Sequence, residues 1–251
     1  MQHVLLTLSI LICVLLVAAP LFQNLVGPFL IWRLQRIPTL VRFPSISEAA
    51  FAENMSAEAV LYERALLALG FVKLDSSSLL NTHATSFFRL YWNAEIELAA
   101  MVVIAKTARK TLCYLEFSQK YEDGSELDVS NATRPGAYPV LGHRLAYRFP
   151  RLLAAEELLD AHTRLRRKHK PDARPVRFEP GRGLRFLEQG MRDESEALLR
   201  LGLVEPEIGD DGKRALTLRG AIALTYRAVP PGLHIWNYLT RRRAERALAA
   251  T

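Results

Sequence analysis

The chain has 251 residues, half of them apolar, and carries 33 Lys and Arg against 26 Asp and Glu, a formal net charge of +7. This composition excludes a disordered chain and leaves room for one or two domains of ordinary size. Ten basic and twelve acidic residues lie up to Ser130, whereas 23 and 14 follow it. A basic second half suggests a polyanionic neighbour, although an Arg-rich genomic composition explains it equally well.

Residues 4–22, VLLTLSILICVLLVAAPLF, carry no charge. As a helix rising about 1.5 Å per residue, they span roughly 28 Å, close to the hydrocarbon thickness of a bilayer. A cleaved leader is disfavoured because no Lys or Arg precedes the run and Pro20 follows its small-residue pair. A buried core helix is the remaining alternative. The pattern predicts a retained transmembrane helix within an anchor of residues 1–32.

The end of this helix is ambiguous because LVGPFLIW, residues 25–32, prolongs the apolar stretch. The helix either stops near Phe22 or continues, bent at Gly27 and Pro28, to Trp32. Arginines begin only at Arg33. By the positive-inside rule, the N-terminus lies outside and residues 33–251 are cytoplasmic. This overall pattern resembles that of bacterial membrane-anchored proteins, and the resemblance implies a bacterial inner (cytoplasmic) membrane.

Residues 33–55 are rich in Pro, Ser and Ala and are predicted to be a juxtamembrane linker. An α+β domain is predicted over residues 56–133. It opens with a helix that Ser56 caps and Gly70 ends, with an apolar face formed by Leu61, Ala65, Ala68 and Leu69. Segments rich in β-branched and aromatic residues follow at 71–74, 86–92, 96–105, 111–121 and 126–130. The short polar turns between them predict an antiparallel sheet with the helix packed on it.

Residues 134–251 are predicted to form a basic, mostly helical region. A loop at 134–144 precedes a helix beginning near Pro150, whose acids come early and whose bases come late, matching the helix dipole. A Pro-rich connector leads to a second helix that ends at Gly202. A hairpin with the turn GDDGK and a short helix stopped by Pro230 and Pro231 follow.

The order of elements over residues 181–228 resembles part of a winged-helix domain. The resemblance is carried by LLRLGLVE at a helix end, GDDGKR at a hairpin tip and LTLRG at the next helix start. It implies a helix that reads the major groove of DNA and a wing that touches phosphate. That helix carries four acids, Glu188, Asp193, Glu194 and Glu196, against three bases, Arg185, Arg192 and Arg200. Because a DNA-reading face should be more basic, a structural winged-helix-like module is favoured.

The last stretch, LHIWNYLTRRRAERALAA, places aromatic residues beside a cluster of arginines. This pattern is typical of an amphipathic helix lying on an anionic leaflet, and a frayed basic helix end is the equal alternative. The predicted membrane-surface contacts are Trp32, Arg33, Arg36, Arg42, Trp236, Arg241, Arg242, Arg243 and Arg246.

No catalytic motif is present, and the two cysteines and six histidines show no metal-ligand spacing. His169 lies among four bases that would repel a cation. Glu95 and Glu97 alternate in a predicted strand region, where they form a possible carboxylate pair or two exposed strand residues. We therefore expect no enzyme, cofactor or metal. The sequence predicts a single-pass membrane protein with a cytoplasmic binding or scaffold domain, whose partners are the bilayer and an unidentified protein. The alternative is a membrane-tethered regulator that binds DNA.

Overall fold

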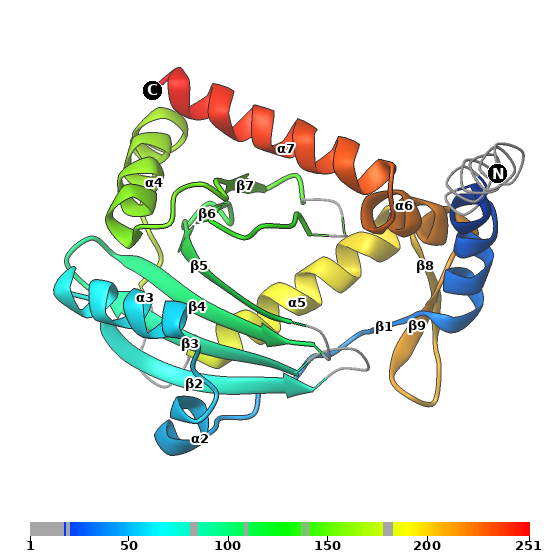
Figure 1. Cartoon of the computed structure of the whole chain (residues 1–251), viewed down its shortest axis with the longest axis horizontal. Coiled ribbons are helices and arrows are strands. Elements are labelled where there is room, and N and C mark those ends of the chain that lie inside the picture. The colour runs from blue at the N-terminus through cyan, green and yellow to red at the C-terminus, as the bar shows by residue number, and fades with distance from the viewer. Residues whose placement is uncertain are drawn as a thin grey trace, which may run out of the picture. The chain divides into compact units, whose positions relative to one another are not determined.

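The computed structural model describes residues 18, 21–80, 85–107, 110–136, 138, 141–177 and 183–251. It confirms a mixed α+β fold, with a six-stranded sheet, a three-stranded sheet and several helices (Figure 1). The chain forms two compact units, and each combines segments far apart in the sequence. Unit 1 combines the described part of Met1–Leu40 with Arg192–Tyr238, and unit 2 combines Val41–Met191 with Leu239–Thr251.

Unit 2 is built on the six-stranded sheet, in the order β2-β3-β4-β5-β6-β7. Its strands are β2 Val72–Leu80, β3 Thr85–Asn93, β4 Leu98–Lys106, β5 Thr111–Lys120, β6 Glu126–Ser130 and β7 Arg144–Arg148. Neighbouring strands pair antiparallel as expected, except β6 and β7, which are parallel. The sequence analysis missed β7, because it starts at the end of a predicted loop and arginines occupy both its ends.

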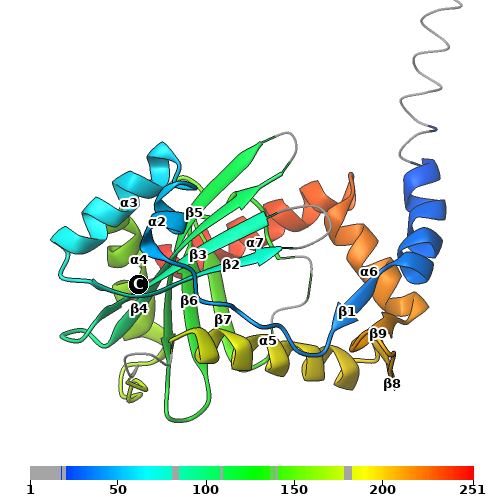
Figure 2. The ribbon, with the colours of Figure 1, turned by 90° about the horizontal axis from the view of Figure 1, so that it is seen from below.

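The sheet of unit 2 has a core face and a second face. On β5, Leu115 and Phe117 are fully buried in the main core, whereas Glu116 alternates with them and lies on the second face. The helices α2 Glu48–Ala52 and α3 Ala57–Ala68 lie on the core side of the strands, and the first half of α5 Gly183–Arg200 crosses the other side (Figure 2). The second face is therefore partly covered.

Helix α3 is capped as its sequence predicts. The Ser56 hydroxyl accepts a hydrogen bond from the Ala59 amide at 3.2 Å, and Gly70 follows the helix with a φ of +81°. The predicted apolar face is right in part, because Ala65 and Leu69 pack against the core. Leu61 is 62% exposed, however, and the buried positions are Ala59, Tyr62 and Leu66. Tyr62 decides the face, since its ring fills the core while its hydroxyl accepts a hydrogen bond from Asn131.

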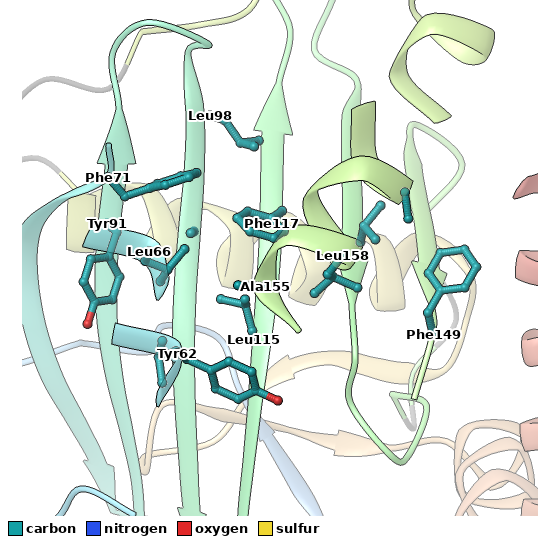
Figure 3. Close-up of a cluster of buried hydrophobic side chains, with 14 of the residues drawn as sticks. Tyr62, Leu66, Phe71, Tyr91, Leu98, Leu115, Phe117, Phe149, Ala155 and Leu158 are labelled. Atoms are coloured by element: carbon teal, nitrogen blue, oxygen red, sulfur yellow. The ribbon is translucent and has the colours of Figure 1, made fainter. Parts of the chain in front are cut away.

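The main core joins the sheet to α3 and to α4 Ala155–His169 (Figure 3), and the last turns of α7 Gly232–Ala249 also pack against it. On α4, Leu158, His162 and Leu165 are all buried. Ala244 of α7 has no exposed surface. The C-terminal turns of α7 are therefore part of the packed body of unit 2.

A buried arginine links the core face of the sheet to α2 and α3. Arg89 on β3 is 1% exposed and donates to the carboxylates of Glu63 at 2.9 Å and Glu48 at 2.8 Å. Its Nε donates to the Ser76 hydroxyl at 3.0 Å. Burial opposes ionisation of Glu63, but the hydrogen bond from Lys73 and the charge of Arg89 still lower its pKa. The arginine thus satisfies two carboxylates at the helix-to-sheet junction.

Unit 1 contains a three-stranded sheet in the order β1-β9-β8. Strand β1 is Arg36–Pro38, β8 is Val204–Ile208 and β9 is Lys213–Leu216, and α6 Leu218–Ala228 follows. The predicted hairpin and the helix after it are confirmed. β1 was not foreseen; it and α2 both fall in residues 33–55, where a linker without regular structure was expected.

Most of the predicted membrane span lies outside the described residues, which include only 18, 21 and 22 of residues 4–22. Residues 21–34 form one helix that continues through Gly27 and Pro28, so the helical segment does not stop at Phe22. None of the helices within the described ranges combines the length and the apolar character that crossing a bilayer requires.

Replacing Arg89 should destabilise the junction between α2, α3 and the sheet. We expect Arg89→Met to lower the free energy of unfolding by about 3 kcal/mol, because it leaves the carboxylates of Glu48 and Glu63 without their buried partner. Urea unfolding in mild detergent, followed by circular dichroism, measures the loss. Arg64→Met, at an exposed position on α3, is the matched control. A loss no larger than that of the control would contradict the role of Arg89.

Candidate functional site

The predicted membrane-surface residues fall in both units. Trp32, Arg33, Arg36 and Trp236 belong to unit 1, whereas Arg42 and the four arginines of α7 belong to unit 2. In unit 1, the Arg33 guanidinium lies 5.5 Å from the centroid of the Trp32 ring, and Arg227 lies 4.7 Å from that of Trp236. Both aromatic residues are therefore next to a cation, and Trp32 is 38% exposed.

The two remaining predicted contacts outside α7 lie beside acidic side chains. Arg36 on β1 is 4.0 Å from the Asp211 carboxylate, and Arg42 is 3.9 Å from that of Glu188. Both arginines are largely exposed, so these ion pairs are weak and leave the guanidinium groups accessible to solvent.

The arginines of α7 meet a second basic run on α4. We call the two runs together the basic surface, which comprises Arg164, Arg166, Arg167, Lys168 and Lys170 from α4 and its end, and Arg241, Arg242, Arg243 and Arg246 from α7. The two runs are more than 70 residues apart in the sequence. Unit 2 brings them together, which the sequence analysis, having treated each run separately, did not predict.

Hydrogen bonds to the end of α7 hold the two runs side by side. The Arg164 guanidinium donates to the Leu248 carbonyl at 3.1 Å, and the Lys168 ammonium donates to the Ala247 carbonyl at 3.1 Å. Arg148 on β7 donates to the Thr240 hydroxyl at 3.0 Å. Carbonyls in the last turn of a helix carry partial negative charge, so cations from α4 are favourable there.

The charges of the basic surface act on a histidine within it. The His169 ring stacks on Tyr147 with a centroid distance of 5.7 Å, and its Nε2 lies 3.1 Å from the tyrosine hydroxyl oxygen. Burial lowers the pKa of His169, and the positive charges of Lys168 and Arg243, one from each run, lower it further. This electrostatic environment favours an anion over a metal cation.

The surface of α4 also has a polar hollow of about 320 Å³, lined by Thr163, Arg166, Arg167, Lys170 and Pro171. Three cations around one hydroxyl-bearing residue are suited to phosphate or carboxylate oxygens. Lys170 is partly engaged, because its ammonium donates to Asp123 at 2.9 Å. The hollow thus gives the basic surface a concave part.

A second polar cluster lies on the second face of the unit 2 sheet, where Arg144 on β7 faces three carboxylates. Arg144 donates to Asp128, and it lies 3.7 Å from both Glu116 and Glu126. Asp128 is 2% exposed, and its Oδ1 has no hydrogen-bond partner within the described residues. Burial, followed by the charge of Asp128, raises the pKa of Glu116 to about 7. The cluster therefore holds a proton more tightly than ordinary carboxylates do.

The structure corrects the carboxylate pair considered from the sequence. Glu95 and Glu97 lie in the turn between β3 and β4, and do not share a strand face. Glu97 has a φ of 52° and pairs with Arg177 at 2.7 Å. Glu126 and Asp128 on β6 have the i, i+2 spacing that places two residues on one face of a strand. This spacing is the sequence signal from which the carboxylate cluster around Arg144 could have been predicted.

Within the described ranges, no three His, Cys, Asp or Glu side chains are grouped so that they could hold a metal ion. Comparison of the chain with family models, with curated proteins and with solved structures finds no match.

Because the pKa of Glu116 is raised, the free energy of unfolding should depend on pH near neutrality. Its pKa in the folded state lies above its ordinary value near 4.5, so the folded chain binds the extra proton between those values, and this contribution to stability falls as the pH rises through about 7. We expect Glu116→Gln to become more stable relative to the native chain by about 2 kcal/mol between pH 5 and pH 8.

Urea unfolding at a series of pH values measures this difference. Subtracting the two curves removes the contribution of other groups such as His162, whose pKa burial lowers to about 3. Glu122→Gln, at an exposed turn position, makes the same chemical change outside the cluster. Parallel curves for Glu116→Gln and the native chain would exclude a raised pKa at Glu116.

Proposed function

We propose that the chain is a single-pass membrane protein whose N-terminal helix anchors a cytoplasmic, non-enzymatic binding or scaffold domain. The observation that carries the proposal is the helix over residues 21–34, which continues the charge-free stretch and exposes large apolar side chains. Leu25 is 67% exposed, Phe22 is 63% exposed and Leu34 is 79% exposed. Contiguous apolar surface of this kind is typical of a membrane or protein contact.

One side of this helix is packed within unit 1. Pro28 is buried, and the Asn24 amide donates to the Pro230 carbonyl at 2.9 Å. The apolar side chains named above lie on the rest of its surface. A helix that is fixed on one side and apolar on the other fits the end of an anchor entering the interface, with Trp32 and Arg33 at headgroup level. The basic flank after it supports a cytoplasmic location for the rest of the chain.

The basic surface of unit 2 supports a second contact with the same membrane. Arg242, Arg243 and Arg246 are exposed on α7, and α4 adds the exposed Arg167 and Lys168. Each base near an anionic leaflet contributes about 1 kcal/mol, and an anchor raises the effective concentration of the surface at the bilayer. In this proposal, the anionic cytoplasmic leaflet is the partner of the basic surface.

A DNA-binding regulator is the alternative function, and one observation favours it. The hairpin of β8 and β9 lies between α5 and α6 in the sequence of elements that resembles a winged helix, and β1 pairs with β9 to complete a three-stranded sheet. Acidic residues on α5 weigh against it, although Glu196 is engaged by Arg214 at 3.2 Å. Salt-dependent binding of the full chain to duplex DNA would favour this alternative, and no binding at low ionic strength would exclude it.

Membrane anchoring is tested in cells with the full chain. We expect it to stay in the membrane pellet after alkaline carbonate extraction, because only integral segments resist that treatment. We also expect a reporter fused after residue 42 to be active on the cytoplasmic side. Release into the supernatant, or an extracytoplasmic reporter signal, would overturn the proposed anchor or its orientation.

The second contact is tested by flotation of a chain starting at Ala18, which keeps every described residue. We expect neutralising Arg242, Arg243 and Arg246 to glutamine to weaken binding to vesicles of phosphatidylcholine with phosphatidylglycerol by about ten-fold or more. Substitution is a cleaner test than truncation of α7, since Ala244 is fully buried.

Two controls accompany the flotation experiment. Neutralising the exposed bases Arg64, Lys110 and Arg134 removes the same charge from other parts of unit 2. Vesicles of phosphatidylcholine alone measure the contribution of the apolar helix over residues 21–34. Equal losses for both triple variants on anionic vesicles would show that net charge alone matters, and would exclude a specific contact.

A further inference from the structure

A cavity of about 380 Å³ opens beside the basic surface, entirely within unit 2. Its wall is formed by the segment after β7, by α4 and by the last turns of α7. The lining residues are Phe149, Pro150, Arg151, Leu152, Arg164, Arg241, Glu245, Leu248 and Ala249. Five of them are apolar, three are arginines and one is acidic. Its volume falls within the usual range for small-molecule sites.

The charged residues of the cavity leave an excess of positive charge. Arg241 lies 3.5 Å from Glu245 one turn along α7, so the single carboxylate is offset. Arg164 is held in place by the Leu248 carbonyl and the Thr251 hydroxyl. Arg151 is exposed in the segment before α4. An anionic group at the rim would meet planar guanidinium groups, which match phosphate oxygens in geometry.

The apolar residues of the cavity are accessible from the same opening. Phe149 belongs to the main core, whereas Leu152 and Leu248 are only partly buried. Leu153, which follows the lining segment, is 67% exposed. A hydrated polyanion such as nucleic acid has no hydrocarbon chain that could pack against this apolar wall. An anionic lipid carries a charged group and a hydrocarbon chain in the same molecule, so it can contact both the arginines and the wall.

We propose that this cavity binds one anionic phospholipid of the bilayer, with its phosphate at Arg151, Arg164 and Arg241 and the first part of an acyl chain against Leu152 and Leu248. This inference rests on the proposed function, because it takes the anionic leaflet as the partner of the basic surface. The basic surface alone would attract anionic lipids without a fixed position. The cavity adds a defined site that binds one phospholipid per chain.

The test uses the full chain in micelles of an uncharged detergent, so that it does not depend on attachment to a membrane. Photoactivatable phosphatidylglycerol and phosphatidylcholine, each labelled in the acyl chain, are crosslinked, and the modified residues are mapped by mass spectrometry. We expect phosphatidylglycerol to label residues 149–153 and 245–249, with about ten-fold less labelling by phosphatidylcholine.

Two pairs of variants separate the cavity from its surroundings. Ala249→Trp fills the exposed end of the cavity without changing any charge and should reduce the labelling about ten-fold, whereas Ala250→Trp, one residue outside the lining, should not. Arg151→Gln should reduce it to a similar extent, whereas Arg134→Gln, at an exposed arginine outside both the lining and the basic surface, should leave it nearly unchanged.

Equal labelling by the two lipids, or labelling that Ala249→Trp does not reduce, would overturn the cavity as a lipid site. The flotation result is independent of this outcome. A loss of vesicle binding in the Arg242, Arg243 and Arg246 variant without site-specific labelling would leave the membrane contact standing and remove the cavity. Specific labelling without a preference for anionic vesicles would instead support the cavity and contradict the surface contact.

Discussion

The hydrogen bonds that α4 donates to the end of α7 are the interaction on which the candidate site depends. Two basic runs repel each other, so their side-by-side arrangement needs a compensating negative charge. The last carbonyls of α7 supply it, because those of Ala247 and Leu248 accept hydrogen bonds from Lys168 and Arg164. The burial of Ala244 fixes the same helix against the main core. The result concentrates positive charge without leaving the backbone of the helix end unsatisfied.

Unit 2 contains two clusters of buried charges, which differ in the ratio of carboxylates to cations. Around Arg89, the carboxylates of Glu48 and Glu63 balance the guanidinium and the Lys73 ammonium, and the network connects α2 and α3 to the sheet. Around Arg144, three carboxylates meet one guanidinium, so one carboxylate is best kept protonated near neutral pH. The first arrangement fixes the register of helices on the sheet, while the second makes stability depend on pH in the physiological range.

Local signals in the sequence predicted the local elements well. The caps of α3, the charge gradient of α4 and the turn between β8 and β9 each depend on a few neighbouring residues, and each is present in the structure. Strands β1 and β7 were missed because their pairing is set by partners far along the chain, β9 for the first and β6 for the second. The face of α3 was predicted only in part, since Ala65 and Leu69 pack against the core but Leu61 does not. Leu61 is more apolar than Tyr62, but only the tyrosine has a buried hydrogen-bond partner.

The difference between local signals and long-range packing also explains which parts of the candidate site could be predicted from the sequence. The arginines of α7 were visible as a run, and so were the bases of α4, but nothing local indicates that the two runs meet. Their meeting follows from tertiary packing, in which β7 carries Phe149 into the core and positions the segment with Arg151 next to α7. A cluster of bases alone suits any polyanion. The apolar wall that packing places beside these arginines narrows the choice, because only an amphiphile satisfies both kinds of surface at once.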